Sequence, residues 1–167
     1  DLLAKQFEDR YPFDVAGLFA GLRTLSLTFQ ASLFELIDNS LGHGNAAKTD
    51  VRIEWYEHTP QKISKVAVVD NGIGMDRETL FGALQTGKSQ TYNQRDTIGR
   101  FGFGLKAGGL NQCRIREVYS QKKNSDSYYA VLDLDEFLGG KKMLTAPIKK
   151  EIPKEFHDVI KNQGTVV

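Results

Sequence analysis

The stretch Asp70-Asn71-Gly72-Ile73-Gly74-Met75 decides the fold of this chain. It directly follows Lys65-Val66-Ala67-Val68-Val69, an apolar and β-branched run that is typical of a buried strand. An acid at the exit of such a strand, with glycines two and four residues later, predicts a turn whose backbone can approach a flat ligand closely. The same pattern occurs in ordinary strand-to-helix turns, so its meaning depends on the sequence around it.

Length, composition and charge limit the classes of protein to which this chain can belong. The 167 residues are 40% hydrophobic and 26% charged, which is typical of a globular domain. The formal net charge of +1 gives no argument for a nucleic-acid or membrane partner. Cys113 is the only cysteine, which excludes an intrachain disulfide and favours a cytoplasmic location, or a nuclear one in a eukaryote. The chain lacks an initial Met and ends on Val166-Val167, so we expect one domain of a longer protein.

Hydrophobic periodicity predicts an N-terminal segment over residues 1–16 and a single domain over residues 17–167. The domain begins with a long helix, because apolar residues recur every three or four positions from Gly17 to Leu41. The elements expected after it are a half-buried strand at Val51–Trp55, a turn at Pro60, a strand at Ile63–Val69, a helix from Asp76 to about Leu84, a polar loop at 85–98, a glycine loop opening a helix at 99–107, paired strands at 115–120 and 128–134, an irregular connection at 135–150, a helix beyond Pro153 and a strand from Gly164. This order favours an α+β two-layer sandwich.

Two further patterns carry chemistry. Glu35 and Asn39 stand four residues apart on the long helix and therefore on one face. A carboxylate there can polarise a water, and an amide oxygen can ligate Mg²⁺, although the pair also fits the polar face of any amphipathic helix. The second pattern is Gly99-x-x-Gly102-x-Gly104, whose exposed N–H groups at a helix N-terminus suit a phosphate chain.

Three other interpretations fail on context. The glycine pattern at 99–104 does not follow a strand, so it does not indicate a dinucleotide-binding fold. Residues 70–75 lack the further acids of a calcium loop. Gly82 to Ser89 matches the P-loop pattern literally, but a helix-like segment precedes it and a polar loop follows. Lys88 within it remains a candidate loop cation near phosphates.

In combination these patterns are specific. Glu-x-x-x-Asn, Asp-x-Gly-x-Gly and Gly-x-x-Gly-x-Gly, followed by Gly164-Thr165, resemble the Bergerat-fold ATPase domain of the GHKL superfamily. That superfamily comprises gyrase B, the ninety-kilodalton heat-shock chaperones, histidine kinases and MutL. The resemblance covers roughly residues 17–167 and is closest to the MORC and MutL branch. MutL-like chains usually continue after Ser40 with Asp-Ala-Gly-Ala, whereas this chain has Leu41 to Ala46.

The resemblance implies a role for each matching residue. Glu35 would orient and activate the attacking water, and Asn39 would ligate Mg²⁺ between the phosphates. Asp70 would bind the amino group of adenine, with support from Thr165. Further nucleotide-binding residues would be Gly72, Gly74, Met75, Lys88, Gly99, Gly102, Phe103, Gly104 and Lys106.

It also implies an architecture and an activity. Helices would cover one face of a mixed, mostly antiparallel sheet, and ATP would lie between them and an ATP lid at residues 85–104. Mg²⁺-dependent binding and slow hydrolysis of ATP would close the lid and drive rearrangement or homodimerisation of a larger protein. MORC and MutL proteins take a catalytic lysine from a second domain that this chain lacks, so we expect very low activity of the isolated domain. We expect no membrane partner, and the sequence does not identify a protein or nucleic-acid client.

Two alternatives stay open. One is a histidine-kinase-type catalytic domain that passes the γ-phosphate to a partner. Histidine kinases usually carry Asn where this chain has Glu35, so this position favours hydrolysis. The other is a module that senses ATP without hydrolysing it.

Overall fold

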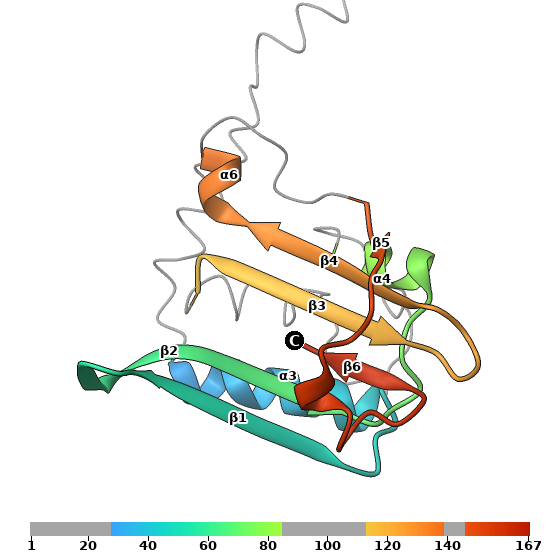
Figure 1. Ribbon diagram of the computed structural model, residues 1–167, viewed down its shortest axis with the longest axis horizontal. Helices are drawn as coiled ribbons and strands as arrows, with labels where there is room; N and C mark the ends of the chain where they lie inside the picture. The colour runs from blue at the N-terminus through green and yellow to red at the C-terminus, as the bar shows by residue number, and fades with distance from the viewer. Residues whose placement is uncertain (1–27, 85–112, 139–145) are drawn as a thin grey trace, which may run out of the picture.

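The computed structural model describes residues 28–84, 113–138 and 146–167. They form a six-stranded sheet in the order β1-β2-β6-β3-β4-β5, and each pairing among these strands is antiparallel (Figure 1). The strands are β1 (Thr49–Tyr56), β2 (Thr59–Asp70), β3 (Ile115–Gln121), β4 (Ser127–Asp133), β5 (Ile148–Lys149) and β6 (Gly164–Val166). The paired strands expected at 115–120 and 128–134, and the strand from Gly164, are confirmed.

Two helices cover one face of the sheet, as the α+β prediction requires. The helix α3 (Phe29–Gly42) lies behind β1 and β2, and α4 (Arg77–Leu84) lies behind the β4 end (Figure 1). On this side Leu80 and Leu84 of α4 pack with Val118, Ala130 and Leu132 of the sheet, all of them buried. Burying a leucine or valine completely contributes roughly 1.5–3 kcal/mol relative to leaving it exposed, so this cluster fixes α4 on the sheet.

The opposite face is covered by an irregular segment, Ile152–Ile160, which leads into β6. Its apolar side chains pack on alternate residues of the strands, and the buried members of this cluster are Ala67, Val69, Tyr119, Ile152, Phe156, Val159, Ile160 and Val166. The prediction of a helix beyond Pro153 is wrong. Only a single 3-10 turn forms, η2 (Lys154–Phe156), because one turn is not stable alone and burial on the sheet decides the path.

The helix α3 begins later than the predicted start at Gly17, and residues 17–27 lie outside the described part of the chain. Thr28 has extended backbone angles (φ −68°, ψ 156°), and its hydroxyl accepts a hydrogen bond from the backbone N–H of Ala31 at 3.2 Å. A capped N-terminus at Thr28 rules out one continuous helix from Gly17 to Leu41. Hydrophobic spacing on both sides of Thr28 resembles one helix, but the cap starts α3 at Phe29.

The β1–β2 hairpin also differs from prediction. Its turn is formed by Glu57 and His58, and Pro60 lies near the start of β2. The helix-side residues Ile53 and Trp55 are 38% and 51% exposed, so only the first half of β1 is half-buried. Figure 1 shows the reason: the tip of the hairpin extends beyond α3.

The connection at residues 135–150 contains regular structure that the sequence did not indicate. The helix α6 (Leu134–Leu138) starts where the Asp133 carboxylate accepts the N–H groups of Asp135 and Glu136. β5 adds a short edge strand to β4. Both elements are too short for a periodic signal, and residues 139–145 lie outside the described part of the chain.

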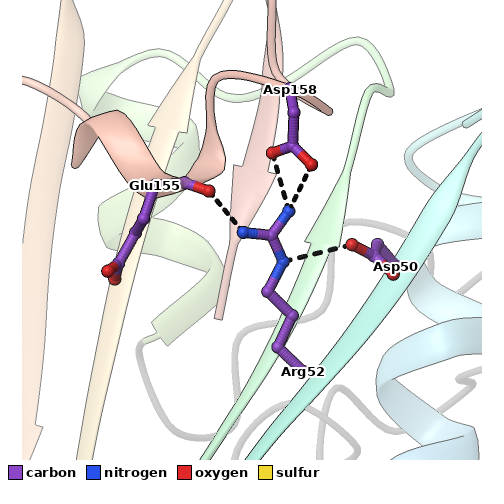
Figure 2. Close-up of polar contacts among 4 residues, drawn as sticks. All are labelled: Asp50, Arg52, Glu155 and Asp158. Atoms are coloured by element: carbon purple, nitrogen blue, oxygen red, sulfur yellow. Dashed lines mark hydrogen bonds and ion pairs between the residues drawn. The ribbon is translucent and has the colours of Figure 1, made fainter.

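One arginine ties the first strand to the irregular segment (Figure 2). The Arg52 guanidinium binds both carboxylate oxygens of Asp158 at 2.6 and 2.7 Å and Asp50 at 3.1 Å, and it donates to the carbonyl of Glu155. It also lies 5.4 Å from the ring centroid of Phe156. The planar fork of arginine can hold all of these partners at once, which a lysine cannot. Arg52 therefore fastens the covering segment to the sheet.

We expect Arg52→Ala to lower the melting temperature by a few degrees, because the ion pair with Asp158 and the contact with the Phe156 ring are both lost. Arg52→Lys should recover only part of the loss. The control is Lys149→Ala, which removes the exposed ion pair with Asp126 and should change little. Thermal unfolding followed by circular dichroism measures each. Equal melting temperatures for Arg52→Ala and Lys149→Ala would show that Arg52 does not hold the segment.

Candidate functional site

Three buried polar residues form a row across the middle of the sheet. Asp70 of β2 is the cross-strand partner of Thr165 in β6, and Thr165 is the partner of Ser120 in β3. Their exposed fractions are 5%, 8% and 0%. Cross-strand partners project from the same face, which here is the face that carries α3 and α4. Polar groups need hydrogen-bond partners when they are buried.

The Asp70 carboxylate is held by donors from separate elements. Its Oδ1 accepts the backbone N–H of Gly72 at 2.8 Å, and its Oδ2 accepts the hydroxyl of Ser40 in α3 at 3.1 Å. Burial raises the pKa of Asp70 above its usual value, and the bonds from Gly72, Ser40 and the Thr165 backbone oppose the rise. The carboxylate is thus an oriented acceptor that is largely withdrawn from water.

The glycines of the turn are required by close packing. A Cβ on Gly72 would stand 2.2 Å from the carbonyl oxygen of Gly44, and one on Gly74 would stand 1.9 Å from that of Gln121. Gly74 also has φ +64°, which side chains disfavour. The turn predicted from residues 70–75 is therefore confirmed, and it is clamped between the end of α3 and the end of β3.

Asn71 locks the turn to the loop after α3, a role that sequence reasoning missed. Its side-chain oxygen accepts the backbone N–H groups of Ala47 and Lys48 at 3.0 and 2.8 Å. The N–H of Ile73 donates to the carbonyl of Gly44 at 2.7 Å. The segment after Ser40, where this chain departs from MutL-like sequences, is thus the surface on which the glycine turn rests.

Glu35 and Asn39 lie on α3, both partly buried and one helical turn apart. The adjacent Ser40 connects this end of the helix to Asp70. The Nδ2 atom of Asn39 is buried and has no hydrogen-bond partner within the described residues. A buried amide without a partner is costly, so the Nδ2 atom of Asn39 is poised to donate to a group outside the described residues.

The amide of Asn39 suits a hard cation that is coordinated jointly by the protein and by a bound ligand. Among the described residues, no three His, Cys, Asp or Glu side chains gather into a metal site. Mg²⁺ is commonly held by one or two protein oxygens, with phosphates and waters completing its shell. A single amide beside a phosphate chain suits that mode of binding, and a cage made only of protein ligands is not present in this part of the chain.

A second clamp fixes the start of α4. Asp76 accepts the backbone N–H of Thr79 at 2.8 Å, which confirms the predicted N-cap, and it binds the ammonium of Lys122 at 2.7 Å. Lys122 and the cap hydrogen bonds hold the pKa of Asp76 well below its usual value. The exit of the glycine turn is therefore joined to the β3–β4 turn.

Part of the predicted site lies outside the described residues. The residues concerned are Lys88, Gly99, Gly102, Phe103, Gly104 and Lys106, together with the expected ATP lid. Of the predicted site residues that are described, the structure brings Asp70, Gly72, Gly74, Met75 and Thr165 together, and Ser40 joins them to the helix of Glu35 and Asn39.

A cavity of about 630 Å³ lies elsewhere, between β2 and β3 near the end of β6. Its described lining includes Leu33 and Leu36 of α3, Val66 of β2, Arg116 of β3 and Val167. None of Asn39, Asp70 and Thr165 belongs to that lining. Cavity size therefore does not locate the candidate site, which the buried polar row identifies instead.

Comparison with known proteins agrees with this geometry. Residues 27–165 match the family described as histidine kinase-, DNA gyrase B- and HSP90-like ATPases. The chain belongs to this family. The GHKL resemblance is thereby confirmed, and membership implies that the domain binds ATP.

Two relatives illustrate the match. The chain is 34% identical over 97 residues to ATPase MORC2B of Mus musculus, covering 58% of this chain and 9% of that protein. It is 33% identical over 133 residues to the B subunit of type 2 DNA topoisomerase 6 from Saccharolobus islandicus, covering 74% of this chain and 24% of that protein. The chain thus spans between about a tenth and a quarter of these relatives' lengths.

Within the described residues, no helix is both long and apolar enough to cross a membrane.

We expect Gly74→Ala to disrupt the turn, because its Cβ would overlap the carbonyl of Gln121 and its φ is unfavourable for alanine. The melting temperature should fall, and amide exchange should speed up around residues 70–76. Gly42→Ala is the matched control, since a Cβ there meets nothing within 4 Å. If the two variants unfold alike, close packing does not determine the turn.

Proposed function

We propose that this domain binds Mg²⁺-ATP at the buried polar row, hydrolyses it slowly, and couples lid closure to rearrangement or dimerisation of a larger protein. The observation that carries the proposal is the hydrogen bond from Ser40 to Asp70, which joins the helix of Glu35 and Asn39 to the glycine turn. This bond connects Asp70, which would recognise the adenine ring, to the helix that carries Asn39, the candidate Mg²⁺ ligand, and Glu35, the candidate residue for orienting water.

The roles follow from the chemistry of each group. Asp70 accepts from the exocyclic amine of adenine, and the bare backbone of Gly72 and Gly74 leaves room for the ring. The Oδ1 atom of Asn39 would ligate Mg²⁺, and its Nδ2 atom, which is buried and has no partner among the described residues, would donate to a phosphate oxygen. Glu35 orients the attacking water. Phosphoryl transfer depends mainly on positioning and charge stabilisation, so this short set is sufficient for slow turnover.

The remaining roles rest on the family alone. These roles fall on residues outside the described part of the chain: the N–H groups of Gly99, Gly102 and Gly104 would bind the phosphates, residues 85–104 would form the lid, and Lys88, Phe103 and Lys106 would contact the nucleotide. The match to one subunit of a topoisomerase supports work within a larger assembly. A sensor without turnover and a kinase that phosphorylates a partner are the alternatives; measurable hydrolysis would exclude the sensor, and transfer of the γ-phosphate to a protein histidine would indicate the kinase.

We expect Asp70→Asn to weaken ATP binding by roughly ten- to a hundredfold, because an amide nitrogen would face the adenine amine and a charged acceptor is lost. Isothermal titration with Mg²⁺-ATP measures the affinity. Asp126→Asn, in the exposed β3–β4 turn, is the control and should bind as the wild type does. Undetectable affinity of the wild type for any adenine nucleotide would refute the ATP site itself.

We expect Glu35→Ala to bind Mg²⁺-ATP normally and to release phosphate about 10²- to 10⁴-fold more slowly, because a positioned base is removed. Glu35→Gln should behave alike, since it keeps the size but cannot accept a proton. Glu78→Ala, on the exposed side of α4, is the control. Phosphate release over long incubations measures the rate. Unchanged hydrolysis by Glu35→Ala would exclude Glu35 as the base, and binding without hydrolysis by the wild type would favour the two alternatives over the proposed ATPase.

A further inference from the structure

Ser120 is the most deeply buried member of the polar row, and no sequence pattern pointed to it. Its side chain is fully enclosed, and its Oγ meets three groups. It accepts the backbone N–H of Met75 at 2.8 Å, donates to the carbonyl of Gly164 at 3.2 Å and lies 2.9 Å from the hydroxyl of Thr165. One hydroxyl therefore connects the glycine turn after β2 to the first two residues of β6.

Counting protons settles the direction of the contact with Thr165. A serine hydroxyl has one proton and two lone pairs. The N–H of Met75 occupies one lone pair, and the Gly164 carbonyl has no proton to give, so it takes the proton of Ser120. Thr165 must then donate to the second lone pair. The reverse arrangement would deprive the carbonyl of Gly164 of this donor, which costs free energy.

This arrangement fixes what Thr165 can offer to a ligand. Its only hydroxyl proton is used by Ser120, so its oxygen is left as an acceptor. Asp70, its cross-strand partner, is an acceptor too, and side chains at such positions stand roughly 5 Å apart. Two neighbouring acceptors suit an amino group with two N–H bonds. They would repel a carbonyl oxygen placed at the same point.

We propose that Ser120 is a positioning residue that holds the Thr165 hydroxyl as an acceptor, so that Asp70 and Thr165 together select a purine with a 6-amino group over one with a 6-oxo group. The inference rests on the proposed ATP site and adds the basis of its selectivity. The 6-oxo purine is rejected because its oxygen would face the acceptor oxygens of Asp70 and Thr165 with no proton between them. Shape alone would discriminate poorly, since the two purines have nearly the same size.

The test compares ATP with inosine triphosphate, which differs at the 6-position, on the purified 167-residue chain. Binding of each nucleotide with Mg²⁺ is measured for the wild type, Ser120→Ala and Ser32→Ala. Ser32 is a matched control, since it is a buried serine on α3 whose hydroxyl has no partner within the described residues. In Ser120→Ala the Thr165 proton becomes free to face the ligand. The ratio of ATP to inosine triphosphate affinity should fall roughly five- to tenfold, and Ser32→Ala should keep the wild-type ratio.

A purely structural serine predicts a different result. Loss of the Met75 and Gly164 contacts alone would lower the melting temperature and weaken both nucleotides equally, and an unchanged ratio would overturn the proposal. If Ser120→Ala does not fold, Thr165→Val is used instead, because it removes the second acceptor. The ratio of ATP to inosine triphosphate affinity should fall by a similar factor, and an unchanged ratio would again overturn the proposal. A wild type that binds neither nucleotide would refute the ATP site, whereas one that binds both without preference would overturn the selectivity alone.

Discussion

The structure depends on one buried carboxylate and the donors that surround it. Asp70 lies almost entirely out of water, and a buried charge is tolerated only when hydrogen bonds replace its hydration. Those bonds come from the glycine turn, from Ser40 of α3 and from the backbone of Thr165 in β6. Satisfying Asp70 therefore requires that a helix, a turn and a strand converge at one point, and that convergence is the candidate site.

The glycine turn transmits this constraint to the rest of the fold. It is packed against the carbonyl of Gly44 on one side and that of Gln121 on the other, at separations that admit no side chain. Asn71 fastens it to the loop after α3, and the Asp76–Lys122 pair fastens its exit to the β3–β4 turn. These contacts hold the turn in place against the elements on both of its sides.

The sequence predicted the turn, the cap at Asp76 and the strand pairs well, because each is encoded by neighbouring residues. It erred where a local cap or longer-range packing decided the outcome. The apolar spacing around Thr28 indicated one helix, but Thr28 has extended backbone angles and its hydroxyl caps α3 at Phe29. The sequence indicated a helix beyond Pro153, but Phe156 and Ile160 reach the sheet through a single short 3-10 turn and irregular backbone. Trp55 alternates like a half-buried residue, yet its hairpin extends past α3 and leaves it exposed.

The sequence by itself determined the chemistry of the candidate site: an acid after a buried strand, two glycines, and a Glu–Asn pair on one helical face. Local spacing suffices for these because each pattern spans only a few residues. The tertiary structure alone decided that Ser120 completes the row, that Ser40 joins the helix to Asp70, and that Arg52 anchors the segment covering the second face. Such pairings join residues from 30 to more than 100 positions apart, and strand register and packing, which local spacing does not encode, bring them together.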